Sequence, residues 1–378
     1  MLKRVLKRWK RTALLGLLLW SVCVSLSVGE LGLRLVGPTL WGRLVSVNLS
    51  YPWIGYHPIL GWVNRPGGWD PGLLINSFGF RGPEVSPWKP RGSVRIVCLG
   101  DSRTFGLWMD AGGFRYDNDY PAALARMLHE DGEHDAEVIN AGVIGYTSAQ
   151  GLAQLQTQVV PLHPDIITVA FGFNDHSLAW NAALGAREPH NPLARELFYW
   201  ASHSYWFRLG KAGFDALPAL HAPPFSERWV DEDEYRHNLR RLVEVGSEYG
   251  IHVLFVSQAL RPIELGEGSQ AVPDHPVDKV GLYQVLGVRN LEALHRVDRA
   301  YRDLLSMVAQ ERGVPVADAF AAFAKPHEPL FGPYDAVHSN PAGARVIAET
   351  IRDKVVELGW LRPAESSIAI SGKSPTGR

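Results

Sequence analysis

A serine in the first third of the chain and a histidine near its end could together perform acyl transfer. Ser102 ends a Gly-Asp-Ser run that directly follows an apolar segment, and His338 lies three residues after Asp335. A serine hydroxyl is a poor nucleophile unless a nearby base takes its proton. A short loop can fold the carboxylate back onto one imidazole nitrogen and leave the other nitrogen facing the serine. The sequence therefore predicts Ser102 as nucleophile, His338 as general base and Asp335 as its partner.

Two further segments could supply the hydrogen-bond donors that acyl transfer needs for the developing oxyanion. An Asn-Ala-Gly run ends at Gly142, and this glycine lets a backbone N–H approach a ligand closely. A Gly-Phe-Asn-Asp run contains Asn174, whose side-chain amide is a second donor. We therefore expect an oxyanion hole that includes Gly142 and Asn174.

These four segments follow or flank a repeating pattern of strands and helices. Apolar runs without alternation are typical of strands that are buried on both faces of a parallel sheet. Such runs occur at 94–99, 136–139, 165–171, 251–256 and 314–317, and helical patterns occur at 119–129, 148–159, 234–248, 291–312 and 341–357. The alternation predicts an α/β fold, a doubly wound sandwich, with the candidate residues at the carboxyl edge of its sheet, where such folds bind ligands.

Taken in order, the four segments resemble the four sequence blocks of the SGNH (GDSL-type) hydrolase superfamily. The resemblance spans about 240 residues, and it implies a three-layer α/β/α sandwich around a five-stranded parallel sheet of flavodoxin-like order 2-1-3-4-5. It also implies that the Ser102 backbone N–H joins the Gly142 N–H and the Asn174 side chain in the oxyanion hole.

The segment before the first strand carries a second resemblance. Asn76 to Gly82, followed by Glu84, is similar to a segment that precedes the Gly-Asp-Ser block in bacterial membrane-anchored SGNH proteins, some of which modify acyl groups on exported polysaccharides. Within it, Arg81 either binds a substrate carboxylate or ties this segment to the domain through Glu84 or a backbone carbonyl. We favour the structural role.

The N-terminus predicts a membrane anchor. Six Lys and Arg residues precede the first acid, Glu30, and an uncharged apolar run of about 18 residues begins at Thr12. The basic cluster should stay in the cytoplasm, which puts the rest of the chain outside it, in the periplasm if the cell is Gram-negative. The alternative is a cleaved signal peptide, which would make the protein secreted.

The expected domain organisation follows from these features. We expect a cytoplasmic basic segment at 1–11, an anchor at 12–33, an irregular lead-in at 34–93, the hydrolase domain at 94–360 with an insertion at about 177–233, and a disordered tail at 361–378. The insertion is rich in aromatic residues. They either line a pocket for a sugar or acyl chain or, as we favour, form the core of a small cap subdomain.

Composition excludes several other classes of function. Six of the 38 Lys and Arg residues lie in the N-terminal cluster, so the remaining 32 face 39 Asp and Glu residues, and the body carries about −7. This charge does not suggest a nucleic-acid partner. The histidines have no metal-ligand spacing, and the two cysteines lie in an apolar run and a strand, so we expect no metal, no cofactor and no disulfide.

The sequence thus predicts a serine-dependent acyl-ester hydrolase outside the cytoplasm that deacylates a glycan or a lipid. One alternative is an O-acyltransferase with the same triad, in which a sugar hydroxyl replaces water in the second step. A second alternative is a non-catalytic binding or scaffold protein of an envelope-polymer assembly.

Overall fold

The structure of the chain is a computed structural model. It describes residues 2–44, 51–110, 113–133, 135–177, 191–215, 230–261, 291–325, 328–332 and 335–361. The predicted tail at 361–378 therefore lies outside the described residues, apart from Leu361.

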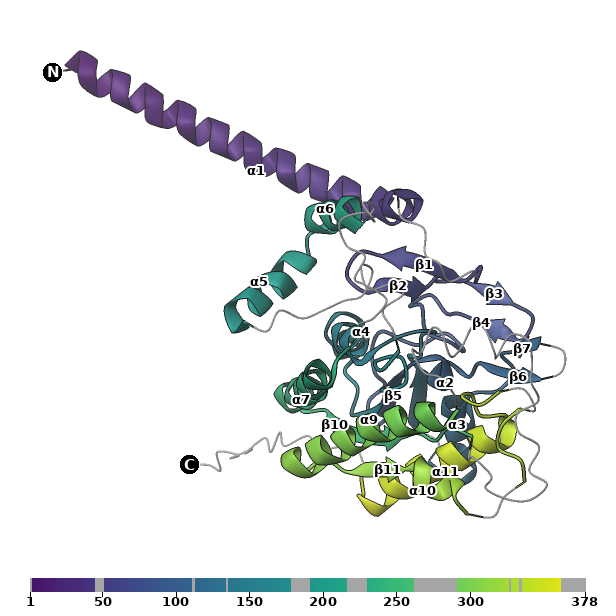
Figure 1. The fold of residues 1–378 in the computed structure, drawn as a ribbon. Coiled ribbons are helices and arrows are strands. Elements are labelled where there is room, and N and C mark those ends of the chain that lie inside the picture. The colour runs from purple at the N-terminus through teal and green to yellow at the C-terminus, as the bar shows by residue number, and fades with distance from the viewer. Residues whose placement is uncertain are drawn as a thin grey trace, which may run out of the picture.

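A five-stranded parallel sheet forms the centre of the domain (Figure 1). The strand order is β11-β10-β9-β5-β8, which is the predicted order 2-1-3-4-5 when these five strands are numbered along the chain. The bounds are β5 (Val94–Gly100), β8 (Ala136–Asn140), β9 (Ile166–Ala170), β10 (His252–Ser257) and β11 (Val316–Asp318). Every residue of β5 and β9 is buried, which agrees with the unalternating apolar runs of the sequence.

Helices cover both faces of the sheet, so the predicted three-layer sandwich is confirmed. On one face, α3 (Tyr120–Glu130) packs against α11 (Pro341–Glu357), with the short α10 (Ala319–Phe323) beside them. On the other face, α7 (Glu232–Glu248) packs between α4 (Ser148–Gln154) and α9 (Leu291–Arg312). The helix predicted over 148–159 has the expected extent, but its last turn, Leu155–Val159, is π-helical.

The lead-in before the sheet is more regular than the sequence predicted. It contains two small antiparallel hairpins, β1 (Ile54–His57) with β2 (Gly61–Asn64) and β3 (Trp69–Asp70) with β4 (Leu73–Leu74). Strands of two to four residues are too short to show a periodic pattern, which is why the prediction of an irregular segment was wrong here. As expected, the lead-in packs on the domain, with Trp53 and Trp62 fully buried.

The β1–β2 hairpin holds the loop that follows β8. Trp62 Nε1 donates to the Ile144 carbonyl at 2.9 Å, and the Tyr146 hydroxyl donates back to the Trp62 carbonyl at 2.5 Å. Asn64 Nδ2 donates to the Gly142 carbonyl at 3.1 Å. We call these contacts the lead-in clamp, because they tie residues 62–64 to residues 142–146.

Arg81 ties the remainder of the lead-in to the domain, which confirms the structural interpretation. Its guanidinium donates to the backbone carbonyls of Phe105 and Tyr116, and its Nε lies 3.2 Å from Asp119 Oδ2. Glu84 serves a different contact, since its carboxylate accepts from Ser77. Arg81 is buried and has its donors engaged by the fold itself, so it is not positioned to bind a substrate carboxylate.

The N-terminal helix α1 (Leu2–Leu44) continues well past the predicted anchor boundary at residue 33. Its stretch Thr12–Gly37, with a mean hydropathy of 1.9, is long and apolar enough to cross a membrane. Figure 1 shows α1 extending away from the domain, with α6 (Tyr205–Asp215) beside its domain-proximal part and α5 (Pro192–Ser202) nearby. A small hairpin, β6 (Trp108–Asp110) with β7 (Gly113–Arg115), completes the described elements around the site.

Candidate active site

Ser102 begins the four-residue helix α2 (Ser102–Phe105) directly after the central strand β5. Asp101 caps this helix by accepting the Arg103 backbone N–H at 2.9 Å. The Ser102 backbone N–H lies in the first turn, where an N–H has no partner within the helix, and no acceptor is assigned to it among the described residues. Ser102 therefore presents both a hydroxyl and a backbone donor at the carboxyl edge of the sheet.

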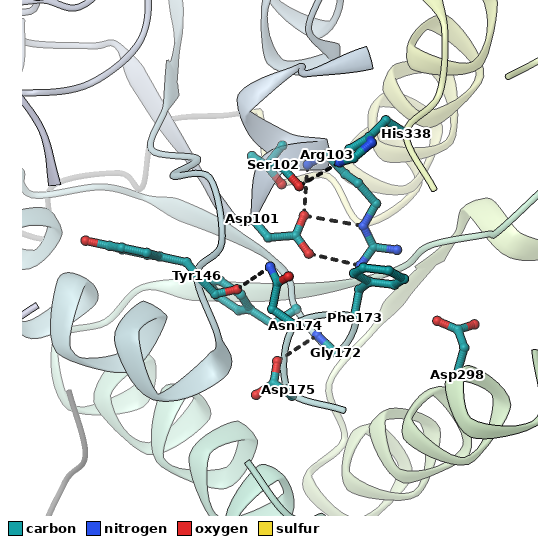
Figure 2. A network of polar contacts seen from close by, with 12 residues as sticks. Asp101, Ser102, Arg103, Tyr146, Gly172, Phe173, Asn174, Asp175, Asp298 and His338 are labelled. Atoms are coloured by element: carbon teal, nitrogen blue, oxygen red, sulfur yellow. Dashed lines mark hydrogen bonds and ion pairs between the residues drawn. The ribbon is translucent and has the colours of Figure 1, made fainter. Parts of the chain in front are cut away.

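The structure brings the three predicted triad residues together, and Figure 2 shows the His338 imidazole beside Ser102. His338 Nε2 lies 2.9 Å from Ser102 Oγ, and His338 Nδ1 lies 3.0 Å from Asp335 Oδ2. Asp335 Oδ1 also accepts the backbone N–H groups of Val337 and His338, each at 2.9 Å. These bonds fix the loop before α11, so that the imidazole is held between the carboxylate and the serine.

The electrostatics of this contact favour a charged Asp335. Burial alone would raise the pKa of its carboxyl group. The attraction and hydrogen bonds of His338, together with the Val337 N–H, outweigh burial and lower that pKa. An ionised carboxylate beside Nδ1 favours the tautomer that carries its proton on Nδ1. Nε2 is then free to accept a proton from Ser102.

Asn174 follows β9 in a loop that is braced from within. Its side-chain Nδ2 donates to the Tyr146 carbonyl at 2.9 Å, which leaves the second hydrogen of the amide available. Asp175 accepts from the backbone N–H and hydroxyl of Ser148 at 2.9 and 2.5 Å and from the Gly172 N–H at 3.0 Å. Gly172 has a φ of 134°, which a residue with a side chain rarely adopts. The loop therefore orients Asn174 toward the loop after β8.

Burial disfavours the ionised form of the Asp175 carboxyl group, which braces this loop. It raises the pKa of Asp175 to about 7, although the hydrogen bonds from Ser148 and Gly172 stabilise the ionised form. Asp175 faces Ser148 and Gly172, and its role in the structure is to hold the loop.

Gly142 does not have the free N–H that the sequence analysis expected. Its N–H donates to Asn140 Oδ1 at 2.9 Å, so an oxyanion would have to displace a bond that the loop already makes. The assignment of Gly142 to the oxyanion hole is therefore corrected, because a donor must be available where the charge develops.

The backbone N–H of Gly145 is better oriented than that of Gly142 to bind an oxyanion. The turn from Val143 to Tyr146 is closed by a 3.2 Å backbone bond, and Gly145 occupies its third position with a φ of 81°. The Ile144 carbonyl accepts from Trp62, and a trans peptide points its N–H away from its C=O. The Gly145 N–H therefore points away from the lead-in. The glycine three residues after Gly142 was the signal in the sequence that could have identified it.

A polar pocket lies beside the nucleophile. Arg103 is buried, paired with the Asp101 carboxylate through Nε and Nη2, and its guanidinium lies 5.4 Å from the centre of the Phe173 ring. Figure 2 shows Arg103 and Phe173 between the Ser102–His338 pair and Asp298. The pocket is small, with room for about one water-sized group, and its lining includes Arg103, Phe173, Tyr235, Gln258, Asp298 and Arg302.

Gln258 in this pocket is buried without a partner. It is 6% exposed, and neither Nε2 nor Oε1 has a hydrogen-bond partner. A buried amide without hydrogen bonds costs about 1–3 kcal/mol, so it is a group that a bound ligand would satisfy. The charges around it are already matched, because Arg103 pairs with Asp101 and Arg302 pairs with Asp298. The sequence analysis missed Gln258, which follows β10 with no motif around it.

One histidine beside the site belongs to the core. His176, next to the Asn174 loop, is completely buried. Its ring lies between those of Phe173 and Tyr301, with centroids 5.1 and 5.5 Å away. The burial of His176 therefore depends on α9, which lies more than a hundred residues later in the chain.

Comparisons with known proteins match most of this domain. A model of the GDSL-like Lipase/Acylhydrolase family matches residues 98–346. The chain is 22% identical over 276 residues to the uncharacterized lipoprotein YqeF of Bacillus subtilis strain 168, which covers 70% of this chain and 90% of the relative. It is 32% identical over 83 residues to an arylesterase of Vibrio mimicus, which covers 22% of this chain and 38% of the relative. A solved lipase/acylhydrolase from Enterococcus faecalis has 18% identity and a TM-score of 0.42, covering 70% of this chain and 96% of its own.

Proposed function

Because the chain belongs to the GDSL-like lipase/acylhydrolase family and is a serine ester hydrolase, we propose that Ser102 is its nucleophile, with His338 and Asp335 as its catalytic partners. The observation that carries this proposal is the continuous contact from Asp335 through His338 to Ser102 Oγ, at 3.0 and 2.9 Å. Both distances lie within the reach that general-base activation requires.

The reaction proceeds in two steps. Ser102 Oγ attacks the ester carbonyl carbon while His338 Nε2 takes its proton, and the bond to the alcohol breaks as His338 returns that proton to the leaving oxygen. Water then gives a proton to His338 and attacks the acyl-Ser102 carbonyl. The acid leaves and Ser102 Oγ regains its proton.

The oxyanion of each step is stabilised by the backbone N–H groups of Ser102 and Gly145 and by Asn174 Nδ2. Gly145 replaces the Gly142 of the sequence analysis, since the Gly142 N–H is bonded to Asn140. The Tyr146 carbonyl accepts one hydrogen of the Asn174 amide and thereby aims the other.

Removing the Asn174 amide should affect the transition state more than substrate binding. Asn174→Ala is expected to lower kcat by about a hundred- to a thousand-fold with little change in KM, because the donor acts mainly once charge develops on the carbonyl oxygen. Steady-state kinetics on an aryl acetate measure this. A variant that mainly raises KM would make Asn174 a substrate-binding residue instead.

We propose that the pocket at Gln258 receives a hydroxyl-bearing part of the substrate, which favours a glycan or glycerol ester. A hydroxyl group both donates and accepts, as the unpaired Gln258 amide requires. An anion is disfavoured there, because both arginines of the pocket already have carboxylate partners. The aromatic rings of Phe173 and Tyr235 provide apolar lining beside these polar groups.

Gln258→Leu tests this subsite against a purely structural role. The variant should raise KM for an acetylated oligosaccharide by about 2- to 10-fold, the effect of one hydrogen bond, and leave the hydrolysis of a simple aryl acetate unchanged. It should also unfold at the same or a higher temperature, because it removes an unpaired buried amide. Equal losses on both substrates would contradict the subsite.

The same oligosaccharide distinguishes hydrolysis from acyl transfer. The wild-type chain should release free acetate even when a second, unacetylated sugar is present in excess. Acetate that appears on the second sugar, with little free acetate, would identify an O-acyltransferase with the same residues. Labelling of Ser102 by a fluorophosphonate distinguishes both activities from a scaffold protein.

We also propose that α1 anchors the protein with its catalytic domain outside the cytoplasm. Basic residues before an apolar span stay inside, and the lipoprotein name of the Bacillus relative agrees with a membrane location. A reporter that is active only outside the cytoplasm, fused after the last residue, should be active. A reporter that works only in the cytosol should be inactive at the same position, and the reverse pattern would overturn the orientation.

A further inference from the structure

Helix α6 begins against the far end of the proposed membrane span. The Glu30 carboxylate of α1 accepts the backbone N–H of Tyr205 at 2.8 Å and that of Trp206 at 3.3 Å, and the Ser204 hydroxyl donates to it at 3.1 Å. An acidic side chain at a helix N-terminus satisfies N–H groups that have no partner within the helix. Glu30 therefore caps α6 from outside the domain's own sequence.

One tryptophan of α6 and one arginine of α1 make further contacts at the same junction. The Trp206 ring covers Gly29, where an added Cβ would lie 2.3 Å from a ring atom, and its Nε1 donates to the Leu26 carbonyl at 3.1 Å. Arg34 donates to the His203 carbonyl at 3.3 Å. The end of α5 and the start of α6 are thus attached to residues 26–34 of α1.

This junction directly follows the uncharged part of the proposed span. The uncharged run from Thr12 to Gly29 is about 27 Å long as a helix, close to the roughly 30 Å of a bilayer's apolar core. Glu30 is the first charged residue after it. If α1 spans the membrane, Glu30 and the helix that it caps lie at the outer boundary of the apolar core.

Helix α5 carries an apolar stripe that the described part of the domain leaves exposed. Leu193, Leu197 and Trp200 are 70%, 57% and 79% exposed, and their spacing puts them on one face of the helix. The sequence analysis favoured a cap subdomain with most of the aromatic residues of the insertion in its core. For Trp200 that is wrong, and Trp206, which is 44% exposed, lies against α1.

We propose that the exposed face of α5, together with Trp206, is a membrane-contacting surface that lies in the outer headgroup region of a phospholipid bilayer beside the anchor. The inference rests on the proposed anchor and goes beyond it, because it adds a second contact with the membrane. Leucine and tryptophan on one face of a short helix are the residues that interfacial helices use, and tryptophan is enriched at this depth. A bilayer is favoured over a protein partner, because α5 leads directly into α6, which packs on α1 at the end of the proposed span, and the end of α5 is bonded to Arg34 of α1. Two contacts restrict how the catalytic domain can rotate above the membrane.

The test uses the full chain in liposomes of phosphatidylcholine and phosphatidylglycerol that carry a nitroxide quencher near the headgroup. A Cys23→Ser background removes the exposed cysteine, and Cys98 is buried. An environment-sensitive fluorophore is attached in turn to Trp200→Cys, to Leu18→Cys within the span, and to Trp88→Cys. Trp88 is the matched control, because it is also 79% exposed but lies in the lead-in, away from α5.

Position 200 should be quenched several-fold by the shallow nitroxide, and position 88 should not be quenched. Position 18 should respond more strongly to a nitroxide placed deep in the acyl chain. Quenching at 18 but not at 200 would leave the anchor standing and overturn the surface contact. An absence of quenching at position 18 would contradict the proposed anchor and therefore also the inference that rests on it. Protection of position 200 that appears only at high protein density, independent of the nitroxide, would assign the face to a second copy of the chain.

Discussion

Replacing Ser102 by alanine is expected to lower kcat by three or more powers of ten, the scale of loss when the nucleophile of a triad is removed. In the proposed mechanism Ser102 Oγ forms the covalent bond with the acyl group, and His338 Nε2, 2.9 Å away, is the base that takes its proton. The variant should also lose all labelling by a fluorophosphonate probe, measured on the full chain in detergent.

Ser93→Ala is the matched control for this experiment. Ser93 lies directly before β5 as Ser102 lies directly after it, it is similarly buried, and its hydroxyl donates only to the Pro90 carbonyl. It should keep both activity and labelling. Labelling that persists in Ser102→Ala would mean that the nucleophile is another residue.

Asp335→Asn is expected to lower kcat by about ten-thousand-fold. An asparagine keeps an oxygen that can accept the Val337 and His338 N–H groups, so the loop should retain its shape. Its amide N–H, however, donates to His338 Nδ1, so the imidazole proton moves to Nε2. Nε2 can then no longer accept the proton of Ser102. The loss of rate therefore comes from the wrong tautomer rather than from a disordered loop.

Kinetics, combined with a thermal melt, separate these two explanations. The variant should melt close to the wild type while its kcat falls. Asp318→Asn is the control, since Asp318 also ends a strand at this edge of the sheet but pairs with Ser257 instead of His338. Should Asp335→Asn keep the wild-type rate, Asp335 would not be the partner of His338.

The sheet and the triad could be predicted from sequence because both depend on local patterns. Each strand is an apolar run, and the candidate residues directly follow strands β5 and β9, so the parallel topology brings them to one edge. The pairing of His338 with Asp335 needs only a three-residue loop, and both lie ahead of a helix whose cap, Asn340, is visible in the sequence.

The remaining features depend on contacts that no local pattern encodes. Choosing Gly145 over Gly142 requires knowing that the Asn140 side chain accepts the Gly142 N–H and that Trp62 Nε1 donates to the carbonyl of Ile144, 82 residues later in the chain. The burial of His176 depends on Tyr301 from a distant helix. The exposure of Trp200 depends on how α5 is held by its contact with α6, which packs on α1.

The lead-in clamp has a consequence for the order in which the protein matures. Trp62 and Leu60 are synthesised before the partners that they need at Ile144, Tyr146 and Gln150, which lie 82 to 90 residues later. At about 5–20 residues per second, these partners follow after roughly 5–20 seconds, during which the Trp62 side chain has no core to enter. The hairpin therefore cannot dock until residues 144–150 have been made, after strands β5 and β8. Even after strands β5 and β8 have been made, the loop 142–146 is not held in place until the β1–β2 hairpin bonds to it.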